Sequence, residues 1–384
     1  MYGSMDLSPS QQERFAAVLA FARDRLSPGA RAREAEARFD RALWDEAAAF
    51  GLAGLPIPEE WGGSGLDAVD TMHVVEALGK GCEDGGLVFS LCAQMFASAV
   101  PLWRSRAPEL RERYLRDVTA GRIICCNGTT EPDAGSDVHA MKTRAVRDGS
   151  DYVLDGSKCF VTNAPIADLF LLYAVTNPGR GMFGISAFLI PRDTPGLSVA
   201  PEHAKTGLPT SPWGTIYLDG CRVPEAWRVG PEGSGAALFG ESMIWERGCL
   251  FAYYVGAMER SLERCVEHAR SRNQFGHPIG HFQLVASRIV DMKLRLETSR
   301  LLLYRAGELH RQGKRCDEAV ALSKLWISEC AVQSGLDAIQ IFGGSAMTPE
   351  TGVDALLRDA IPARVFSGTS EIQRVIVARM MGLK

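Results

Sequence analysis

Apolar residues recur with helical spacing through the first 120 residues, and again from about residue 235 to the C-terminus. Between these two regions, short apolar runs alternate with turn residues, a pattern typical of strands. The sequence therefore predicts a mostly α protein with a β middle domain. We place an N-terminal helical domain at residues 1–122, a β-barrel-like middle domain at 123–232 and a C-terminal helical bundle at 233–384.

The local signals within the first region support this division. Ser8 followed by Gln11 three positions later is the pattern of a capping box, which predicts that a helix begins there. Pro and Gly residues gather in the segment 55–65, so we expect a loop in that place. Further helices are predicted at residues 43–50, 69–78, 87–103 and 110–119.

The middle region carries the signals of an antiparallel β unit. Asp148-Gly149 lies between two apolar runs, Thr143–Val146 and Tyr152–Leu154, which is typical of a β-hairpin. We expect further strands at 159–162, 169–175, 184–190 and 215–218, each bounded by turn residues. Long helices then follow at 236–270, 282–312 and 316–341.

Composition and charge exclude several classes of protein. The chain of 384 residues is 46% hydrophobic and 23% charged, the balance of a globular protein with a large core. A net charge of −4 argues against an electrostatic grip on nucleic acid. No run of 18 apolar residues predicts a membrane span, and residues 1–7 lack the pattern of a signal peptide. We therefore expect a cytoplasmic protein.

Cysteine and histidine spacing gives no metal motif. The ten cysteines contain no CxxC pair, so we interpret them as reduced thiols. His277 and His281 are four residues apart, but Pro278 and Gly280 lie between them and disfavour a shared helical face. We expect no metal site.

Several loop segments carry groups that suit ligand binding. The loop Thr129–Asp137 combines hydroxyls with Gly135, and Phe160 with Thr162 ends a predicted strand. Arg272–Gly276, Gln340–Gly344 and Phe366–Ile372 place glycines or a charge beside helix ends, where N–H groups are free to bind an anion. Each segment alone is also explained as a turn, a core strand or a helix cap.

Taken together and in this order, these segments resemble the acyl-CoA dehydrogenase superfamily. The resemblance covers nearly the whole chain, from about Leu7 to Leu383. Its motifs are Thr130-Glu131-Pro132-x-Ala134-Gly135-Ser136-Asp137, Arg272-x-x-Phe275-Gly276, Gln340-Ile341-x-Gly343-Gly344 and Gly368-Thr369-Ser370-Glu371-Ile372-Gln373-Arg374. It implies a helical domain, a β domain, a four-helix bundle, a tightly held FAD and a homotetramer.

The resemblance also assigns roles to individual residues. Phe160 and Thr162 correspond to residues that face the flavin's isoalloxazine ring, and Thr369 and Glu371 to further FAD contacts. Residues lining the flavin and the pantetheine arm are Asn127, Thr129, Thr130, Gly135 and Ser136. Contacts from a neighbouring subunit to the pyrophosphate and adenine side are Arg272, Phe275, Gln283, Gln340, Gly343 and Gly344.

The catalytic base is the informative departure from the family pattern. Many members place a glutamate just before the Gly-Thr of the last motif, but this chain has Ser367 there, whose hydroxyl is too weak a base. A minority carry the glutamate on the first long helix of the C-terminal domain, where this chain has Glu246. The carboxylate there either acts as a base with a raised pKa or pairs with Arg247 or a distant arginine. We predict that Glu246 is the base, with Ser136, Trp245 and Arg247 as substrate contacts.

Within the superfamily, the chain resembles the L-prolyl-carrier-protein dehydrogenases of pyrrole natural-product biosynthesis. The segments that carry this likeness go beyond what FAD binding needs. They include Glu76–Gly81, Phe89–Ala93, Thr162–Asp168, Ser242–Leu250 and Ile289–Glu297. The likeness implies oxidation of L-proline, held as a thioester on a peptidyl carrier protein, to pyrrole-2-carboxyl thioester.

Three other interpretations stay open at this point. A short- or branched-chain acyl-CoA dehydrogenase would use the same chemistry on an acyl group that is carried by coenzyme A instead of a carrier protein. A non-catalytic scaffold would explain Ser367, and a flavin hydroxylase of the same fold would activate oxygen. The sequence also leaves open whether an electron-transfer flavoprotein or oxygen accepts the electrons.

Overall fold

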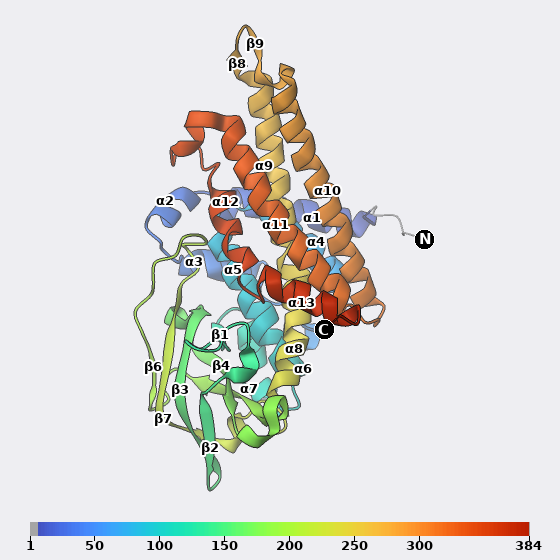
Figure 1. Ribbon diagram of the computed structural model, residues 1–384. Helices are drawn as coiled ribbons and strands as arrows, with labels where there is room; N and C mark the ends of the chain where they lie inside the picture. Colours follow the sequence, from blue (N-terminus) through green and yellow to red (C-terminus); the bar gives the residue numbers. More distant parts are fainter. Residues whose placement is uncertain (1–6, 384) are drawn as a thin grey trace.

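The computed structural model of the chain describes residues 7–383, so the expectation for the extreme N-terminus falls almost wholly outside the described residues. The first region is helical, as predicted (Figure 1). The Ser8 capping box is present, with the Ser8 hydroxyl accepting from the Gln11 amide. The helices are α1 (Pro9–Phe21), α2 (Ala30–Ala35), α3 (Arg41–Ala49), α4 (Ala68–Gly81), α5 (Gly85–Gln94), α6 (Val100–Arg104) and α7 (Pro108–Thr119).

Helices α5 and α6 are joined by a π-helical turn, η3 (Met95–Ala99), into one stretch, Gly85–Arg104. This stretch is long and apolar enough to cross a membrane, but 89% of its most apolar window is buried inside the protein. It is therefore explained as the central helix of the protein core.

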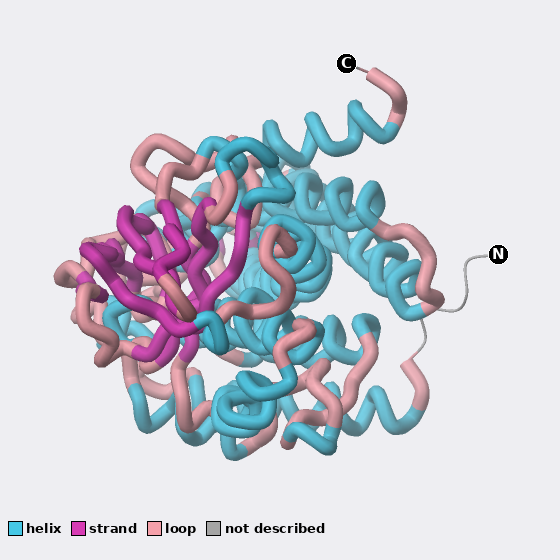
Figure 2. The backbone as a smooth tube through the Cα atoms, turned by 90° about the horizontal axis from the view of Figure 1, so that it is seen from below, coloured by secondary structure: helices cyan, strands magenta, loops and turns pink. Residues whose placement is uncertain are grey.

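The middle region forms one seven-stranded sheet, which lies to one side of the helices (Figure 2). The sheet order is β1-β4-β2-β3-β7-β6, with β5 paired to β4. The strands are β1 (Cys125–Gly128), β2 (Arg144–Asp148), β3 (Asp151–Thr162), β4 (Leu169–Val175), β5 (Ile185–Pro191), β6 (Leu197–Val199) and β7 (Trp213–Pro224).

The expectation of a purely antiparallel unit was wrong. The predicted hairpin is present as β2–β3, but β1 pairs with β4 in parallel, with Cys125 opposite Leu169, and β2 meets β4 in parallel at Arg144. Turn residues predict hairpins, whereas a parallel pair needs a long crossover that leaves no local signal. Here the connection from β1 to β4 runs through the whole β2–β3 hairpin.

The last region is helical again, and its long helices run side by side (Figure 1). The long helix predicted at 236–270 is interrupted by a π-helical turn, η8 (Glu246–Leu250). The elements are α8 (Gly235–Trp245), α9 (Ala252–Ser271), the short strands β8 (Asn273–Gln274) and β9 (His277–Pro278), α10 (Gln283–Arg311), α11 (Asp317–Phe342), α12 (Ala355–Ala360) and α13 (Ser370–Met380).

Close packing fixes the helical regions against each other. A Cβ added to Gly79 of α4 would lie 2.0 Å from the Tyr253 carbonyl oxygen, and one on Gly256 of α9 would lie 2.0 Å from the Glu76 carbonyl oxygen. The two backbones touch here because neither residue has a side chain. This contact holds the start of α9, and with it η8, against the core helices.

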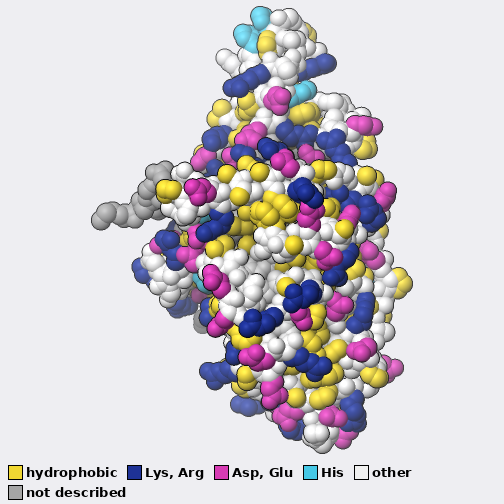
Figure 3. All heavy atoms as spheres, turned by 180° about the vertical axis from the view of Figure 1, so that it is seen from behind, with side chains coloured by type: hydrophobic (Ala, Val, Ile, Leu, Met, Phe, Trp, Pro, Cys, Tyr) yellow, Lys and Arg dark blue, Asp and Glu magenta, His cyan; other side chains and the backbone are white. Residues whose placement is uncertain are grey.

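All ten cysteines are free and buried, in agreement with the interpretation of reduced thiols. On the face seen in Figure 3, basic and acidic side chains are interspersed among hydrophobic ones, and histidines gather near the β8–β9 tip. That face offers no single-sign patch of the kind that binds nucleic acid.

Candidate active site

The predicted base lies at an irregular point of the C-terminal helices. Glu246 is the first residue of the π-helical turn η8, between α8 and α9. Such turns occur mostly as single insertions inside α-helices and are frequent at functional sites. A second π-helical turn, η3, contacts η8. The backbone irregularity at Glu246 is therefore consistent with the sequence argument for this residue.

Ser367 and Glu246, the two positions that compete for the base, are in contact. The Ser367 hydroxyl donates a hydrogen bond to Glu246 Oε1. Ser367 has φ +54°, in the left-handed region that non-glycine residues seldom adopt. Gly368 follows with φ +87°, and Thr369 then accepts from the Ile372 amide as the N-cap of α13. The strained turn directs the Ser367 side chain at the carboxylate.

Arg247 supports this turn and does not pair with Glu246. Its Nε donates to the Ser367 carbonyl oxygen at 2.6 Å, and Gln373 Nε2 donates to the Gly368 carbonyl oxygen at 2.9 Å. Within the described part of the chain, Glu246 forms no ion pair with a lysine or arginine. The alternative of a structural Glu246–Arg247 pair therefore loses its support.

The surroundings of Glu246 suit a general base. Burial raises the pKa of Glu246, opposed by the Ser367 hydrogen bond and by the charges of Arg247 and Lys324. Burial raises the pKa of Cys92 and of Tyr173 as well, and the Glu246 charge adds to both effects, so both side chains lie near it. The side chain nevertheless keeps some access to solvent. A carboxylate in such a place is a stronger base than one in water.

Ser367→Ala tests the role of the hydroxyl. Since the hydrogen bond favours the charged carboxylate, its removal raises the pKa of Glu246 further. The base must be deprotonated to act, so the acid limb of the pH–rate profile should move to higher pH, with a loss of about tenfold below the limb. Steady-state rates from pH 5 to 9 measure the shift, and an unchanged limb would contradict the assignment.

The predicted flavin loop begins at the end of β1. Asn127 Nδ2 donates to the Ala97 carbonyl oxygen of η3 at 2.6 Å, and Asn127 Oδ1 accepts from the Thr129 hydroxyl at 3.1 Å. Asn127 and Thr130 are half-buried, while Gly135 and Ser136 are exposed. The loop thus runs from beside the Glu246 region out to solvent.

An ion pair missed by the sequence analysis fixes this loop. Lys158 of β3 is fully buried, and its Nζ lies 2.7 Å from Glu131 Oε1. Glu131 also accepts from the backbone amides of Lys142 and Thr143, at 2.5 and 3.0 Å. The signal was present in the sequence: a lone lysine in an apolar strand must find a partner when buried.

The second predicted flavin segment presents an exposed aromatic ring. Phe160 is 59% exposed, has φ +57° and lies at a register shift of the β3–β7 pair. Its ring centroid is 5.0 Å from that of Trp213, and Thr162 is half-buried beyond it. The irregular strand turns Phe160 outward, which leaves a flat apolar surface for a planar ligand.

The other predicted cofactor residues fall in two further places. Thr369 and exposed Glu371 lie at the start of α13, next to Ser367. The remaining group lies at the β8–β9 end of α9 and the C-terminal end of α11, away from α8 in Figure 1. Its members, all exposed or half-exposed, are Arg272, Phe275, Gln283, Gln340, Gly343 and Gly344.

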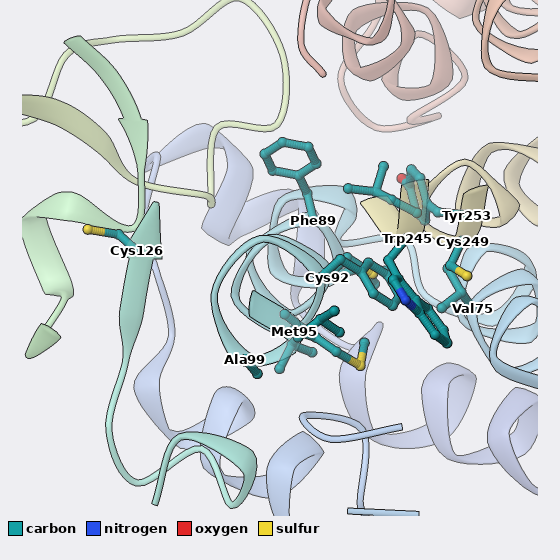
Figure 4. Close-up of a cluster of buried hydrophobic side chains, with 14 of the residues drawn as sticks. Val75, Phe89, Cys92, Met95, Ala99, Cys126, Trp245, Cys249 and Tyr253 are labelled. Carbon is teal, nitrogen blue, oxygen red and sulfur yellow. The ribbon is translucent and has the colours of Figure 1, made fainter. Parts of the chain in front are cut away.

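The predicted substrate contacts are not brought together. Trp245 is buried and packs on His310, at 4.6 Å between ring centroids. Figure 4 shows Trp245 among core side chains, beside Cys249 and Val75. Ser136 is exposed on the loop, and Arg247 holds the Ser367 turn. Only Arg247 of these three contacts the immediate surroundings of Glu246.

Comparison with known families identifies the family of the chain. Family models for the acyl-CoA dehydrogenase N-terminal, middle and C-terminal domains match residues 8–122, 126–221 and 233–382. The chain belongs to the acyl-CoA dehydrogenase family. The expected fold of helical, β and helical regions is thereby confirmed.

Comparison with individual members of the family gives a more specific likeness. The chain is 49% identical to an L-prolyl-[peptidyl-carrier protein] dehydrogenase of a Serratia species, over 99% of this chain and 98% of that protein. A Pseudomonas fluorescens protein of the same name is 47% identical over 90% and 91%. The solved structure titled "PigA with FAD and proline" is 48% identical with a TM-score of 0.97, each chain covered to 99%.

A further acyl-CoA dehydrogenase-like structure is the prolyl acyl carrier protein oxidase AnaB. It is 40% identical with a TM-score of 0.96, over 98% of this chain and all of that chain. Butyryl-CoA dehydrogenase of Megasphaera elsdenii, at 30% identity, has a TM-score of 0.94. The backbone fold is thus shared widely in the family, while identity is higher with proteins named for prolyl carriers.

Proposed function

We propose that this protein oxidises L-proline, held as a thioester on a peptidyl carrier protein, to pyrrole-2-carboxyl thioester, using FAD. The observation that carries the proposal is the 49% identity, over nearly the full length of both chains, to an L-prolyl-[peptidyl-carrier protein] dehydrogenase. The contact between Glu246 and Ser367 supports it, because it places a carboxylate at the turn from which the family's more common base acts.

The residues present fit FAD. Exposed Phe160, beside Trp213, offers a flat ring face, and half-buried Thr162 follows it two residues later on β3. At the distal group, a Cβ on Gly343 or Gly344 would meet nothing within 4 Å, so the backbone there is open to a ligand. When bound, FAD supplies the acceptor for the hydride that leaves the substrate.

Glu246 performs the proton transfer in this proposal. The thioester carbonyl acidifies the α-hydrogen of the prolyl group, and the raised pKa of Glu246 matches a base acting near neutral pH. The Ser367 hydroxyl holds the carboxylate in one orientation, and Arg247 holds Ser367. These groups remain fixed while the proton moves, which is the condition for efficient transfer.

One chain does not bring all the proposed FAD residues to one place. Helix α9 has 20 residues and separates Glu246 from Arg272 by about 30 Å at 1.5 Å per residue. A second copy would place its Arg272 and Phe275 on the flavin held beside Glu246 of the first. Phe275 is 91% exposed, and α10 also exposes Leu284, Val290 and Leu294. These apolar surfaces support the proposed homotetramer.

Arg272→Ala tests the proposed role of the distal group. Loss of one charge-assisted contact to the pyrophosphate should weaken FAD retention about tenfold or more. The measurement is the flavin-to-protein absorbance ratio after dilution and gel filtration. Arg270→Ala, an exposed arginine two residues earlier on α9, serves as the matched control. Equal flavin loss in both variants would contradict the assignment.

The carrier protein, a cytoplasmic location and the electron acceptor belong to the same proposal. Arg104 and Arg106 are exposed on the α6–α7 surface, and Arg104 lies 3.4 Å from Glu241 of α8. Since Glu241 precedes Glu246 by five residues, this surface is close to the site and suits an acidic carrier domain. The electrons then pass to an electron-transfer flavoprotein or to oxygen.

The deciding experiment measures the mass of the aminoacyl-phosphopantetheine arm on the carrier protein. The purified protein is incubated with prolyl-loaded carrier protein and, in parallel, with short- and branched-chain acyl-CoA. We expect the carrier arm to lose the mass of four hydrogens, and the acyl-CoA substrates to react at least a hundredfold more slowly. Faster oxidation of acyl-CoA would favour the competing dehydrogenase, an oxygen atom gained would favour a hydroxylase, and a colourless, inert protein would favour a scaffold.

A further inference from the structure

Lys324, on α11, is a buried amine. Its side chain is 0% exposed, and its Nζ has no hydrogen-bond partner among residues 7–383. The Nζ lies 5.4 Å from the ring centroid of Phe251. An unpaired amine at full burial is costly, so its presence calls for an explanation other than packing.

Lys324 adjoins the two segments that form the Glu246–Ser367 contact. Phe251, over which the amine lies, follows η8 in the chain, and its ring is 5.6 Å from that of Phe366, the residue before Ser367. Val320, one turn earlier on α11, packs near Gly248 of η8. Lys324 is thus enclosed by the two segments that carry the candidate base and its hydrogen-bond donor.

The charges that face Lys324 come from each of these elements. Burial, together with the positive charge of Arg247 in η8, lowers the pKa of Lys324 to about 7. Glu329 of α11 and Glu371 of α13 oppose this, while Arg364 of the 3-10 turn Pro362–Arg364 adds to it. The Lys324 charge in turn lowers the pKa of Glu246, so Lys324 lies within electrostatic reach of the candidate base.

The proposed reaction creates a need for such a group. Conversion of a prolyl to a pyrrolyl thioester removes two protons and two hydrides from one substrate. The first dehydrogenation leaves Glu246 protonated, and a protonated carboxyl cannot accept the second proton. Ser367, its hydrogen-bond partner, has no lasting capacity for a proton, and Arg247 is permanently charged.

We infer that Lys324 takes the proton from Glu246 between the two dehydrogenations, so that one carboxylate acts twice on one bound substrate. This inference rests on the proposed function. The step is balanced: the neutral amine becomes an ammonium group as the carboxyl group becomes a carboxylate. Both hydrides leave to the flavin, which the terminal oxidant, oxygen or an electron-transfer flavoprotein, must reoxidise after the first. Lys324 is a positioning residue for protons and does not touch the substrate.

Lys324→Met, which removes the amine and keeps the length of the side chain, tests this inference. The holoenzyme is mixed with prolyl-loaded carrier protein and oxidant, and the arm is weighed at intervals from milliseconds to minutes. For the wild type we expect loss of four hydrogens with little intermediate. For the variant, the first step should keep its rate within threefold, and the species lacking two hydrogens should accumulate because the second step slows at least tenfold.

Controls separate this inference from the proposed function and from misfolding. Lys293→Met, at an exposed lysine of α10, should behave as the wild type. Lys324→Arg should stall like the methionine variant, because a guanidinium cannot accept a proton at neutral pH. If the wild type itself removes no hydrogens from the prolyl arm, the proposed function fails. If the Lys324→Met variant forms pyrrole with the wild-type ratio between the rates of the two dehydrogenations, or slows both equally, the inference fails while the proposed function stands.

The burial of Lys324 also allows a test that measures stability and needs no enzymatic turnover. Between pH 7 and 10.5 the unfolded chain binds more protons at this amine than the folded chain does, so the fold loses stability as the pH falls through that range. Lys324→Met should therefore raise the melting temperature most at pH 6 to 7, and the gain should vanish as the pH approaches 10.5. A gain that does not change with pH would overturn the premise of a proton-accepting amine.

Discussion

Glu246→Gln is expected to lower the rate of flavin reduction by roughly 10²- to 10⁴-fold, the usual contribution of a general base. Glutamine keeps the size of the side chain and can still accept from the Ser367 hydroxyl, so the turn at Ser367 should stay intact. It cannot take a proton from the prolyl α-carbon. The measurement is the loss of flavin absorbance after anaerobic mixing with prolyl-loaded carrier protein in a stopped-flow instrument.

The matched control is Glu13→Gln, at an exposed carboxylate of α1. Its replacement should leave the rate of flavin reduction within about twofold, because an exposed surface charge contributes little. Both variants should purify with bound flavin, since neither carboxylate is among the proposed FAD contacts. A Glu246→Gln protein that reduces flavin at the wild-type rate would remove Glu246 from the mechanism.

A candidate for the base could be named from the sequence, but its environment could not. The sequence shows both that position 367 lacks a carboxylate and that position 246 carries one. The hydrogen bond between them joins residues 121 positions apart, across η8 and the turn before α13. No local pattern predicts the left-handed conformation of Ser367, because non-glycine residues adopt it only where surrounding structure imposes it.

The predicted substrate contacts show the same limit of reasoning from sequence alone. Trp245 is adjacent to Glu246 in sequence, which suggested that it lines the same pocket. On a helix, however, neighbouring residues point about 100° apart, and Trp245 turns into the core beside Cys249 (Figure 4). Lys324, which adjoins the segments of the site, is 78 residues away in the chain and gave no signal at all.

The fold, too, was predictable where it depends on local sequence, and it was not predictable where it depends on contacts between distant segments. The long helices at 282–312 and 316–341 were predicted to within two residues, because amphipathic periodicity and short turns are local properties. The π-helical turn at Glu246 and the parallel pairing of β1 with β4 depend on contacts between distant segments. Both features lie next to the candidate site, where local rules are most often overridden.

Lys158→Met is expected to lower the apparent free energy of unfolding by about 3–5 kcal/mol at pH 7, because it leaves the buried carboxylate of Glu131 without its partner. The same change should loosen the loop Thr129–Ser136, so bound flavin should be lost at a lower urea concentration than in the wild type. Urea titrations followed by circular dichroism and by flavin fluorescence measure the two effects. Lys142→Met, at an exposed lysine of the same loop region, should change neither.

The pH dependence of that loss distinguishes a broken ion pair from a packing defect. Attraction to Lys158, with backbone and Thr143 hydrogen bonds, holds the pKa of Glu131 below its usual value against the opposing effect of burial. The wild-type pair therefore contributes stability above the unfolded pKa of a glutamate, about 4.3, and loses it as the pH falls through the lower folded pKa. Without Lys158 the carboxyl group protonates at milder acidity and ceases to be a buried charge. The stability difference between wild type and variant should thus shrink as the pH falls from 7 toward 4, whereas a simple packing defect would cost the same at every pH.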